Sequence, residues 1–164
     1  GSDLLRDRAG MGQAAAAASL ASIVGGMTLG RLAGAPFLSR YDPERALIGA
    51  FILAGAGFAI AWTSTNPLVM TIGYVITGMG IGLHWPLGVG RAIRASAGRT
   101  DRGAGFTLIA SSLASGLMPL ALGAVSDRVG VHTAFLIVPL LMSTAIALIV
   151  LRPVAAVIAE DPEN

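Results

Sequence analysis

The chain has 164 residues, of which 54% are hydrophobic and only 12% are charged, and its mean hydropathy is +0.75. This composition, with 22 glycines, indicates an integral membrane protein. The net charge of +2 comes from eleven arginines sited mostly between apolar segments, and no basic patch with interleaved aromatic residues indicates nucleic-acid binding. Cysteine is absent, which excludes disulfides and thiolate metal sites.

The chain begins with a short polar segment, residues 1–12, followed by a first apolar span at about residues 13–38. The polar segment is not a signal peptide, because Asp3 and Asp7 interrupt its basic residues. Three glycines of the span form two overlapping GxxxG units: Gly26, Gly30 and Gly34. We interpret these units as a helix contact, although chance could produce this spacing in a glycine-rich chain.

A short connection, SRYDPER, joins the first span to a second one at about residues 46–62. Arg31 lies near the end of the first span, where its long stem can carry the guanidinium to the lipid headgroups. The second span is about 26 Å long as a helix, near the lower limit for crossing a bilayer. Trp62 and the uncharged polar residues after it mark the opposite membrane interface.

The third span, at about residues 67–91, is the longest apolar stretch and has the best-marked end. It carries no charge from Pro67 to Gly90, which is about 36 Å as a helix and enough to cross a hydrocarbon layer of ~30 Å. Four arginines then follow, as expected where a membrane helix reaches the cytoplasm: Arg91, Arg94, Arg99 and Arg102.

The third span has two unlike faces. At steps of three and four residues, one stripe is small and polar: Gly73, Thr77, Gly80, His84, Gly88 and Arg91. The opposite stripe is aliphatic: Ile72, Ile76, Met79, Leu83 and Leu87. Small residues let helices approach closely in lipid, so we expect the first stripe to face protein and the second to face lipid.

His84 is an ionisable side chain within this span. Such residues are costly in a membrane and often mark a substrate or proton pathway, so His84 is a candidate, together with Thr77 on the same stripe. Tyr74 and Trp85 lie off the aliphatic face and could line the same cavity. With an unperturbed pKa of about 6.5, histidine can change charge in a proton-coupled cycle. The alternative for His84 is a hydrogen bond to a neighbouring helix that serves packing alone.

The fourth span, at about residues 104–125, carries its own stripe of small and polar residues: Ser112, Gly116, Pro119 and Gly123. Pro119 predicts a kink, which could belong to a gating helix or could only shape packing. Ser111 and Ser115 lie beside this stripe and are further pathway candidates. A fifth span follows at about residues 131–151, and the acidic tail, residues 153–164, is too short to cross the membrane again.

Five spans place the two termini on opposite sides of the membrane, and the arginines give the orientation. Eight arginines fall on one side and three on the other. Because basic residues favour the cytoplasmic side, we expect a cytoplasmic C-terminus in the plasma or inner membrane. An odd number of spans that begins outside indicates that a preceding helix is missing.

No pattern in the sequence indicates an enzyme, a cofactor or a metal site. Metal-ligand spacings are absent, and His84 and His132 lie on different spans. The glycines near Gly80 lie inside a membrane-length apolar run and do not follow a strand, so they are not a nucleotide fingerprint. A dyad of Ser111 or Ser115 with His84 lacks a further group to orient the imidazole.

Two connections between spans resemble the helix–DRxG–helix link of the major facilitator superfamily. GAVSDRVGVHTAF, residues 123–135, has the motif itself. LAGAPFLSRYDPERALIGA, residues 32–50, resembles a degenerate copy in which Ser39 and Arg40 stand where Ser-Asp-Arg is usual. Between them, GMGIGLHWPLGVGRAIRA, residues 78–95, resembles the tenth helix of that family.

The resemblance covers about residues 13–152 and implies an all-α membrane fold. The five spans would be helices eight to twelve of a twelve-helix secondary transporter, and they would form a six-helix bundle that lacks its first helix. Such a transporter moves a small solute by alternating access and would pair this chain with its missing N-terminal helices. The resemblance also implies a charge latch in the two connections, for which the candidates are Arg40, Asp42, Arg45, Asp127 and Arg128. A different class stays open, namely a stand-alone structural or assembly subunit whose glycine faces dock onto partner helices.

The arginine asymmetry makes a topology prediction, which the absence of native cysteine makes simple to test. A single cysteine at Ala97 is expected to react with an impermeant thiol reagent only from the cytoplasm, and one at Ser64 only from outside. Reversed labelling of the two positions would show that the orientation is wrong.

Overall fold

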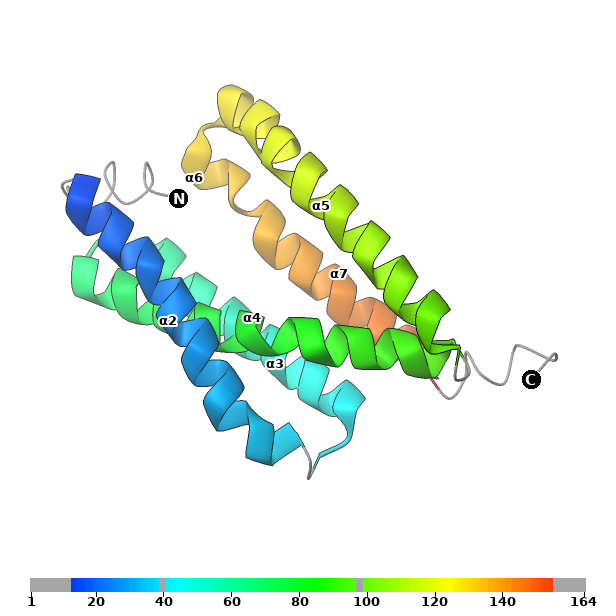
Figure 1. The fold of residues 1–164 in the computed structure, drawn as a ribbon. Coiled ribbons are helices and arrows are strands. Elements are labelled where there is room, and N and C mark those ends of the chain that lie inside the picture. The colour runs from blue at the N-terminus through cyan, green and yellow to red at the C-terminus, as the bar shows by residue number, and fades with distance from the viewer. Residues whose placement is uncertain (1–12, 39–40, 97–98, 155–164) are drawn as a thin grey trace. The chain divides into compact units, whose positions relative to one another are not determined.

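A computed structural model describes residues 13–38, 41–96 and 99–154, and within these ranges the chain is helical without strands (Figure 1). The elements are α2 (Gln13–Leu38), α3 (Pro43–Thr63), α4 (Pro67–Ala95), α5 (Thr100–Val129), α6 (Val131–Ala134) and α7 (Ile137–Leu151). The expected all-α architecture is confirmed. The third and fourth expected spans are longer in the structure, because α4 continues through Arg91 and Arg94 and α5 begins at Thr100.

Two helices begin with the same local motif, a short polar residue followed by proline. Asp42 Oδ1 accepts hydrogen bonds from the backbone N–H groups of Glu44 at 3.0 Å and Arg45 at 3.1 Å. Asn66 Oδ1 accepts one from the N–H of Leu68 at 2.9 Å. In each case proline takes the next position, where a helix needs no N–H donor. The starts of α3 and α4 are therefore fixed by local chemistry.

The connection from α5 into α6 depends on a glycine. Gly130 has a φ of +80°, in the left-handed region that residues with a Cβ rarely adopt, and its N–H donates to the carbonyl of Ser126. The fifth expected span is divided into α6 and α7 by a short turn at Phe135 and Leu136.

Four segments of the described chain are long and apolar enough to cross a membrane: Pro43–Thr63, Pro67–Ala95, Thr100–Val129 and Val131–Leu151. The protein is therefore a multi-pass membrane protein. The expected first span forms the helix α2 but is not among these four, so its crossing of the membrane stays a prediction.

The chain forms two compact units, and α4 contributes to both. The first, residues 1–84, contains α2, α3 and the first part of α4, and the second, residues 85–164, contains the rest of α4 with α5, α6 and α7.

Within the first unit, α2 and α4 meet backbone to backbone. A Cβ atom added at Gly26 or Gly30 of α2 would lie closer than 3.0 Å to the backbone of α4, at Val75 and Met79 respectively. The relation is reciprocal, because a Cβ added at Gly78 or Gly82 of α4 would lie just as close to the backbone of α2, at Ile23 and Met27 respectively. At the far end of the contact, the hydroxyls of Ser19 and Thr71 share a hydrogen bond of 3.1 Å.

The contact of α3 with α4 follows the same rule on a different face of α4. Cβ atoms added at Gly73 and Gly80 would collide with α3, at Ala61 and at Ala50 and Ala54. Ala54 is completely buried there. Gly73, Thr77 and Gly80 thus lie on the face for which a protein neighbour was expected.

The aliphatic stripe of α4 does not face lipid along its whole length. Met79 lies against Gly30, the Leu83 side chain lies against Gly34, and Leu87 is buried. The expectation of a lipid-facing stripe is therefore wrong for these three residues. The reason is that α4 has helices on two sides, and only part of its circumference is left for lipid. Ile72, with 49% of its surface exposed, keeps the expected position.

Pro86 lies inside α4 and has no N–H to donate to the carbonyl of Gly82 four residues earlier. The Nε atom of Arg31, on α2, donates a hydrogen bond of 3.2 Å to that carbonyl. A neighbouring helix therefore satisfies the backbone group that the proline leaves free, which is the condition for tolerating proline in a membrane helix. The sequence predicted that Arg31 would reach the lipid headgroups, and it did not predict this hydrogen bond to α4.

Gly25 and Gly30 of α2 form a matched pair for testing the glycine contact. Both become better helix formers when changed to alanine, but only Gly30 lacks room for the new methyl group. We expect Gly30→Ala to lower the free energy of unfolding by about 1–3 kcal/mol, the usual cost of overpacking. Gly25→Ala should leave it unchanged or raise it. Thermal unfolding in detergent measures both, and equal values would contradict the close contact.

Candidate functional site

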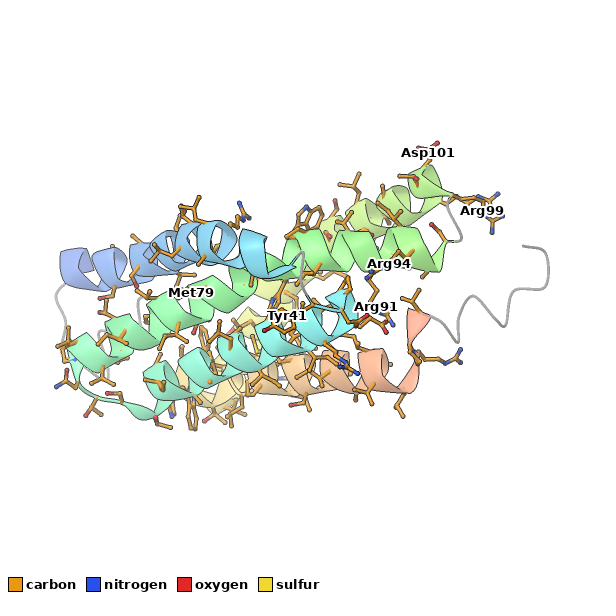
Figure 2. The ribbon with its side chains drawn as sticks, turned by 90° about the horizontal axis from the view of Figure 1, so that it is seen from below. Tyr41, Met79, Arg91, Arg94, Arg99 and Asp101 are labelled. Carbon is orange, nitrogen blue, oxygen red and sulfur yellow. The ribbon has the colours of Figure 1, made fainter. Side chains whose placement is uncertain are left out.

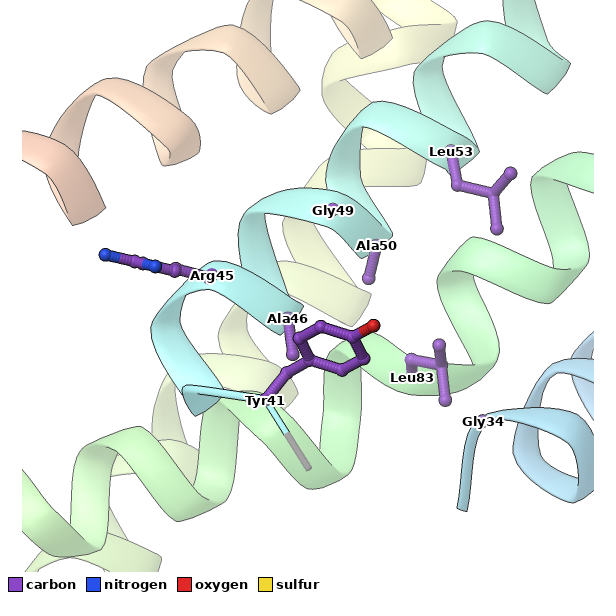
Figure 3. A pocket seen from close by; sticks show the side chains of 8 residues that line it. All are labelled: Gly34, Tyr41, Arg45, Ala46, Gly49, Ala50, Leu53 and Leu83. Atoms are coloured by element: carbon purple, nitrogen blue, oxygen red, sulfur yellow. The ribbon is translucent and has the colours of Figure 1, made fainter. Parts of the chain in front are cut away.

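A cavity of about 240 Å³ lies in the first unit, where the end of α2 approaches α3 and α4 (Figure 3). Small residues of α3, among them Ala46, Gly49 and Ala50, leave this space open. Figure 3 shows the ring of Tyr41 beside Ala46, whereas the Arg45 side chain runs away from the ring. We call this space the Tyr41 cavity.

A second hollow of about 230 Å³ shares three lining residues with the Tyr41 cavity, namely Gly34, Leu53 and Leu83. Its other lining residues, Gly30, Ala33 and Met79, carry no polar side chain. The two spaces are therefore neighbours, and polar side chains line only the Tyr41 cavity.

His84 of α4 lies next to this region and makes two contacts with α3. Its ring stacks on Phe51 with a centroid distance of 4.1 Å and an angle of 27° between the planes. The imidazole is also hydrogen-bonded to the backbone of Ala50, a residue that lines the Tyr41 cavity. These two contacts fix the position of the ring.

The other ring nitrogen of His84, Nε2, is buried and has no hydrogen-bond partner in the described part of the chain. A buried polar atom without a partner is uncommon and costs free energy, about 1–3 kcal/mol. His84 therefore has one hydrogen bond to α3 and one buried ring nitrogen that no described residue satisfies.

The structure places the other pathway candidates differently. Thr77 is 5% exposed, donates to the carbonyl of Gly73 at 2.8 Å and lies against Gly57, so it occupies a packing position between α3 and α4. Tyr74 is half-buried on α4. Trp85, with 48% of its surface exposed, belongs to the second unit.

Ser111 and Ser115 lie on α5 in the second unit. Ser111 donates to the carbonyl of Thr107 at 2.6 Å, within the same helix, and Ser115 is exposed. Pro119, four residues after Ser115, removes the N–H that would bond to the Ser115 carbonyl.

The small and polar face of α5 is open. Cβ atoms added at Gly116 and Gly123 would meet nothing within 4 Å, and Pro119 is exposed. Gly88 of α4 also has open space around it. Within the second unit, Gly116 and Gly123 therefore have no close neighbour on this face of α5.

The latch candidates lie at the ends of helices. Asp42 caps α3 and Arg45 lines the Tyr41 cavity, whereas Asp127 and Arg128 are exposed in the last turns of α5. Arg40 lies outside the described residues. The sequence reasoning did not single out Tyr41, and the signal available was an aromatic residue beside two charges in a connection between spans.

Comparison with known proteins decides the family. The family model for the Major Facilitator Superfamily matches residues 2–163, which is nearly the whole chain. The chain belongs to the major facilitator superfamily. The expected membership of this superfamily is therefore confirmed, and this superfamily consists of membrane transporters and not of enzymes. No curated protein and no solved structure matches the chain.

Two substitutions of Asp42 separate its role as the N-cap of α3 from the effect of its negative charge. Asn is as good an N-cap residue as Asp, whereas Ala cannot accept the two hydrogen bonds from Glu44 and Arg45. We expect Asp42→Ala to lower the free energy of unfolding by about 1 kcal/mol and Asp42→Asn to leave it nearly unchanged. Thermal unfolding of both variants in one detergent provides the comparison. Equal destabilisation would show that the charge, and not the cap, stabilises α3.

Proposed function

We propose that this superfamily member is the C-terminal part, about helices eight to twelve, of a secondary transporter that moves a small solute by alternating access. The observation that carries the proposal is His84, whose imidazole is held by Phe51 and Ala50 while Nε2 is buried without a partner. The arginine distribution supports placement in the plasma or inner membrane with a cytoplasmic C-terminus.

His84 would act as the proton-coupling or solute-binding group. A proton taken up by Nε2 from one side of the membrane and released to the other changes the charge at a fixed point beside the Tyr41 cavity. The change of charge would bias the two conformations of the transporter, because a cation in a poorly hydrated position is stable only with a compensating group nearby. The rigid ring position suits such a role, since stacking on Phe51 limits its movement.

The open face of α5 supports the presence of further helices. In lipid, small residues contribute to stability mainly where another helix packs on them, and within the second unit Gly116 and Gly123 have open space around them while Pro119 is exposed. We propose that the preceding helices of the same transporter cover this face. In that arrangement Ser111 and Ser115 would lie at the interface between the two bundles, where such transporters bind their solute.

The same open face favours a second function, an assembly subunit that docks onto helices of another protein. The two proposals differ in one measurable respect, because only the first gives the assembled protein uptake activity. An uptake assay against a panel of small metabolites, with the chain joined to the helices that precede it, separates them. Uptake by the 164-residue chain alone would contradict the proposal that it is part of a longer transporter.

The connection between α2 and α3 would serve as a latch through Arg40, Asp42 and Arg45. Asp42→Asn keeps the cap of α3 but removes the negative charge, so slower transport by this variant at equal stability would support the latch. If a variant with all three residues neutralised transports at the parent rate at equal expression, the latch proposal is wrong.

Replacing His84 with glutamine tests the central proposal. Glutamine retains hydrogen-bonding capacity but does not titrate, so we expect uptake to lose the pH dependence that protonation of His84 gives it. If Nε2 contacts the solute, the apparent affinity should fall about tenfold as well. Phe51→Leu is the matched control, since it removes the ring stack and leaves the titrating group in place. If His84→Gln keeps both the parent affinity and the parent pH profile, His84 is a packing residue.

A further inference from the structure

The second unit contains a hollow of about 390 Å³ where the end of α4 meets the start of α5. The two helix ends are in direct contact, because a Cβ added at Gly103 would lie 2.8 Å from the carbonyl oxygen of Ala92. Arg91, Ser96, Arg102 and Phe106 line the hollow beside this contact, so we call it the Arg102 hollow.

The charge around the Arg102 hollow is strongly positive. Arg91 and Arg102 line it, and Arg94 and Arg99 lie on the same stretch of chain. The only acidic residue between positions 91 and 106 is Asp101, whose side chain points away from Arg91 in Figure 2. The residues that line the hollow thus carry two positive charges and no negative charge.

The fold holds the side chain of Arg91 and the turn that carries Arg102. Arg91 is half-buried, and its Nη2 donates to the backbone carbonyl of Arg152 at the end of α7. Arg102 lies in the first turn of α5, and its backbone N–H donates to the carbonyl of Arg99 at 3.1 Å. The Ser96 hydroxyl lies 2.8 Å from the carbonyl of Ile93 and 3.0 Å from that of Arg99, so it stabilises the turn.

The hollow also has an apolar side, which indicates the kind of anion. Phe106 has 73% of its surface exposed, and Ala92 and Ala95 continue the apolar lining. The charges begin at Arg91, directly after the uncharged stretch of α4 that ends at Gly90, so the hollow lies at the boundary between hydrocarbon and headgroups. A small soluble anion would not contact the apolar side, whereas a phospholipid can place its phosphate against the arginines and its acyl chains against Phe106.

We propose that the Arg102 hollow binds the phosphate of an anionic phospholipid of the surrounding leaflet. Guanidinium groups match phosphate oxygens with paired hydrogen bonds, and basic pockets between membrane helices are known to take such headgroups. The site is separate from His84 and from the transport proposal, and it would anchor the corner between α4 and α5 to the membrane surface.

The test measures binding of phosphatidylglycerol to the purified chain in mild detergent by native mass spectrometry, with phosphatidylcholine as the neutral lipid. Arg102→Gln should weaken phosphatidylglycerol binding about fivefold, and Arg91→Gln with Arg102→Gln by at least tenfold. Arg128→Gln is the matched control, because it removes the same charge from an exposed position at the other end of α5. It should change binding less than twofold, and phosphatidylcholine binding should not respond to any of the variants.

Two further measurements make the outcome decisive. Arg102→Lys keeps the charge and should retain most of the binding, so a loss in Arg102→Gln at unchanged thermal stability is not a folding effect. Inorganic phosphate should not displace the lipid, because the apolar side contributes to binding. Equal losses in Arg102→Gln and Arg128→Gln, or full displacement by inorganic phosphate, would overturn the proposal.

Discussion

The close approach of α4 to both α2 and α3 is the constraint on which the first unit depends. In lipid no hydrophobic force drives helices together, so their contact relies on packing and on hydrogen bonds between them. Here the close packing depends on glycines, which have no side chain to keep the backbones apart. Gly26 and Gly30 accept the backbone of α4, Gly78 and Gly82 accept the backbone of α2, and alanines of α3 meet the other face of α4. The Tyr41 cavity and the position of His84 follow from these contacts, because Ala50 and Phe51 reach His84 only when α3 lies this close.

Much of this architecture could be predicted from the sequence, because helix formation in a membrane is governed by local composition. Apolar runs of sufficient length, separated by short polar connections, give the elements and their approximate ends. The start of α3 was also readable, since Asp42 followed by Pro43 is a typical capping pattern. The family followed from residues in the connections, which lie at fixed offsets from one another along the chain.

The parts that the sequence could not supply depend on contacts between distant residues. Periodicity divides α4 into two faces, but it does not say that helices pack on both, and Met79 and Leu83 were therefore assigned to lipid. The candidate site shows the same limit. His84 stands out as an ionisable residue in an apolar run, but its stacking on Phe51 and the buried state of Nε2 appear only once α3 is placed. Thr77 looked equally polar in the sequence, and its hydroxyl is in fact satisfied by Gly73 within α4.

The hydrogen bond from Arg31 to Gly82 gives α4 an unusual mechanical property. Most helices hold their shape by their own backbone ladder, but at Pro86 one rung is supplied by a side chain of another helix. Releasing this hydrogen bond would leave the Gly82 carbonyl without a partner, so the backbone at Pro86 depends on the contact of α4 with α2. A side chain of α2 therefore supports α4 within two residues of His84, the candidate pathway residue.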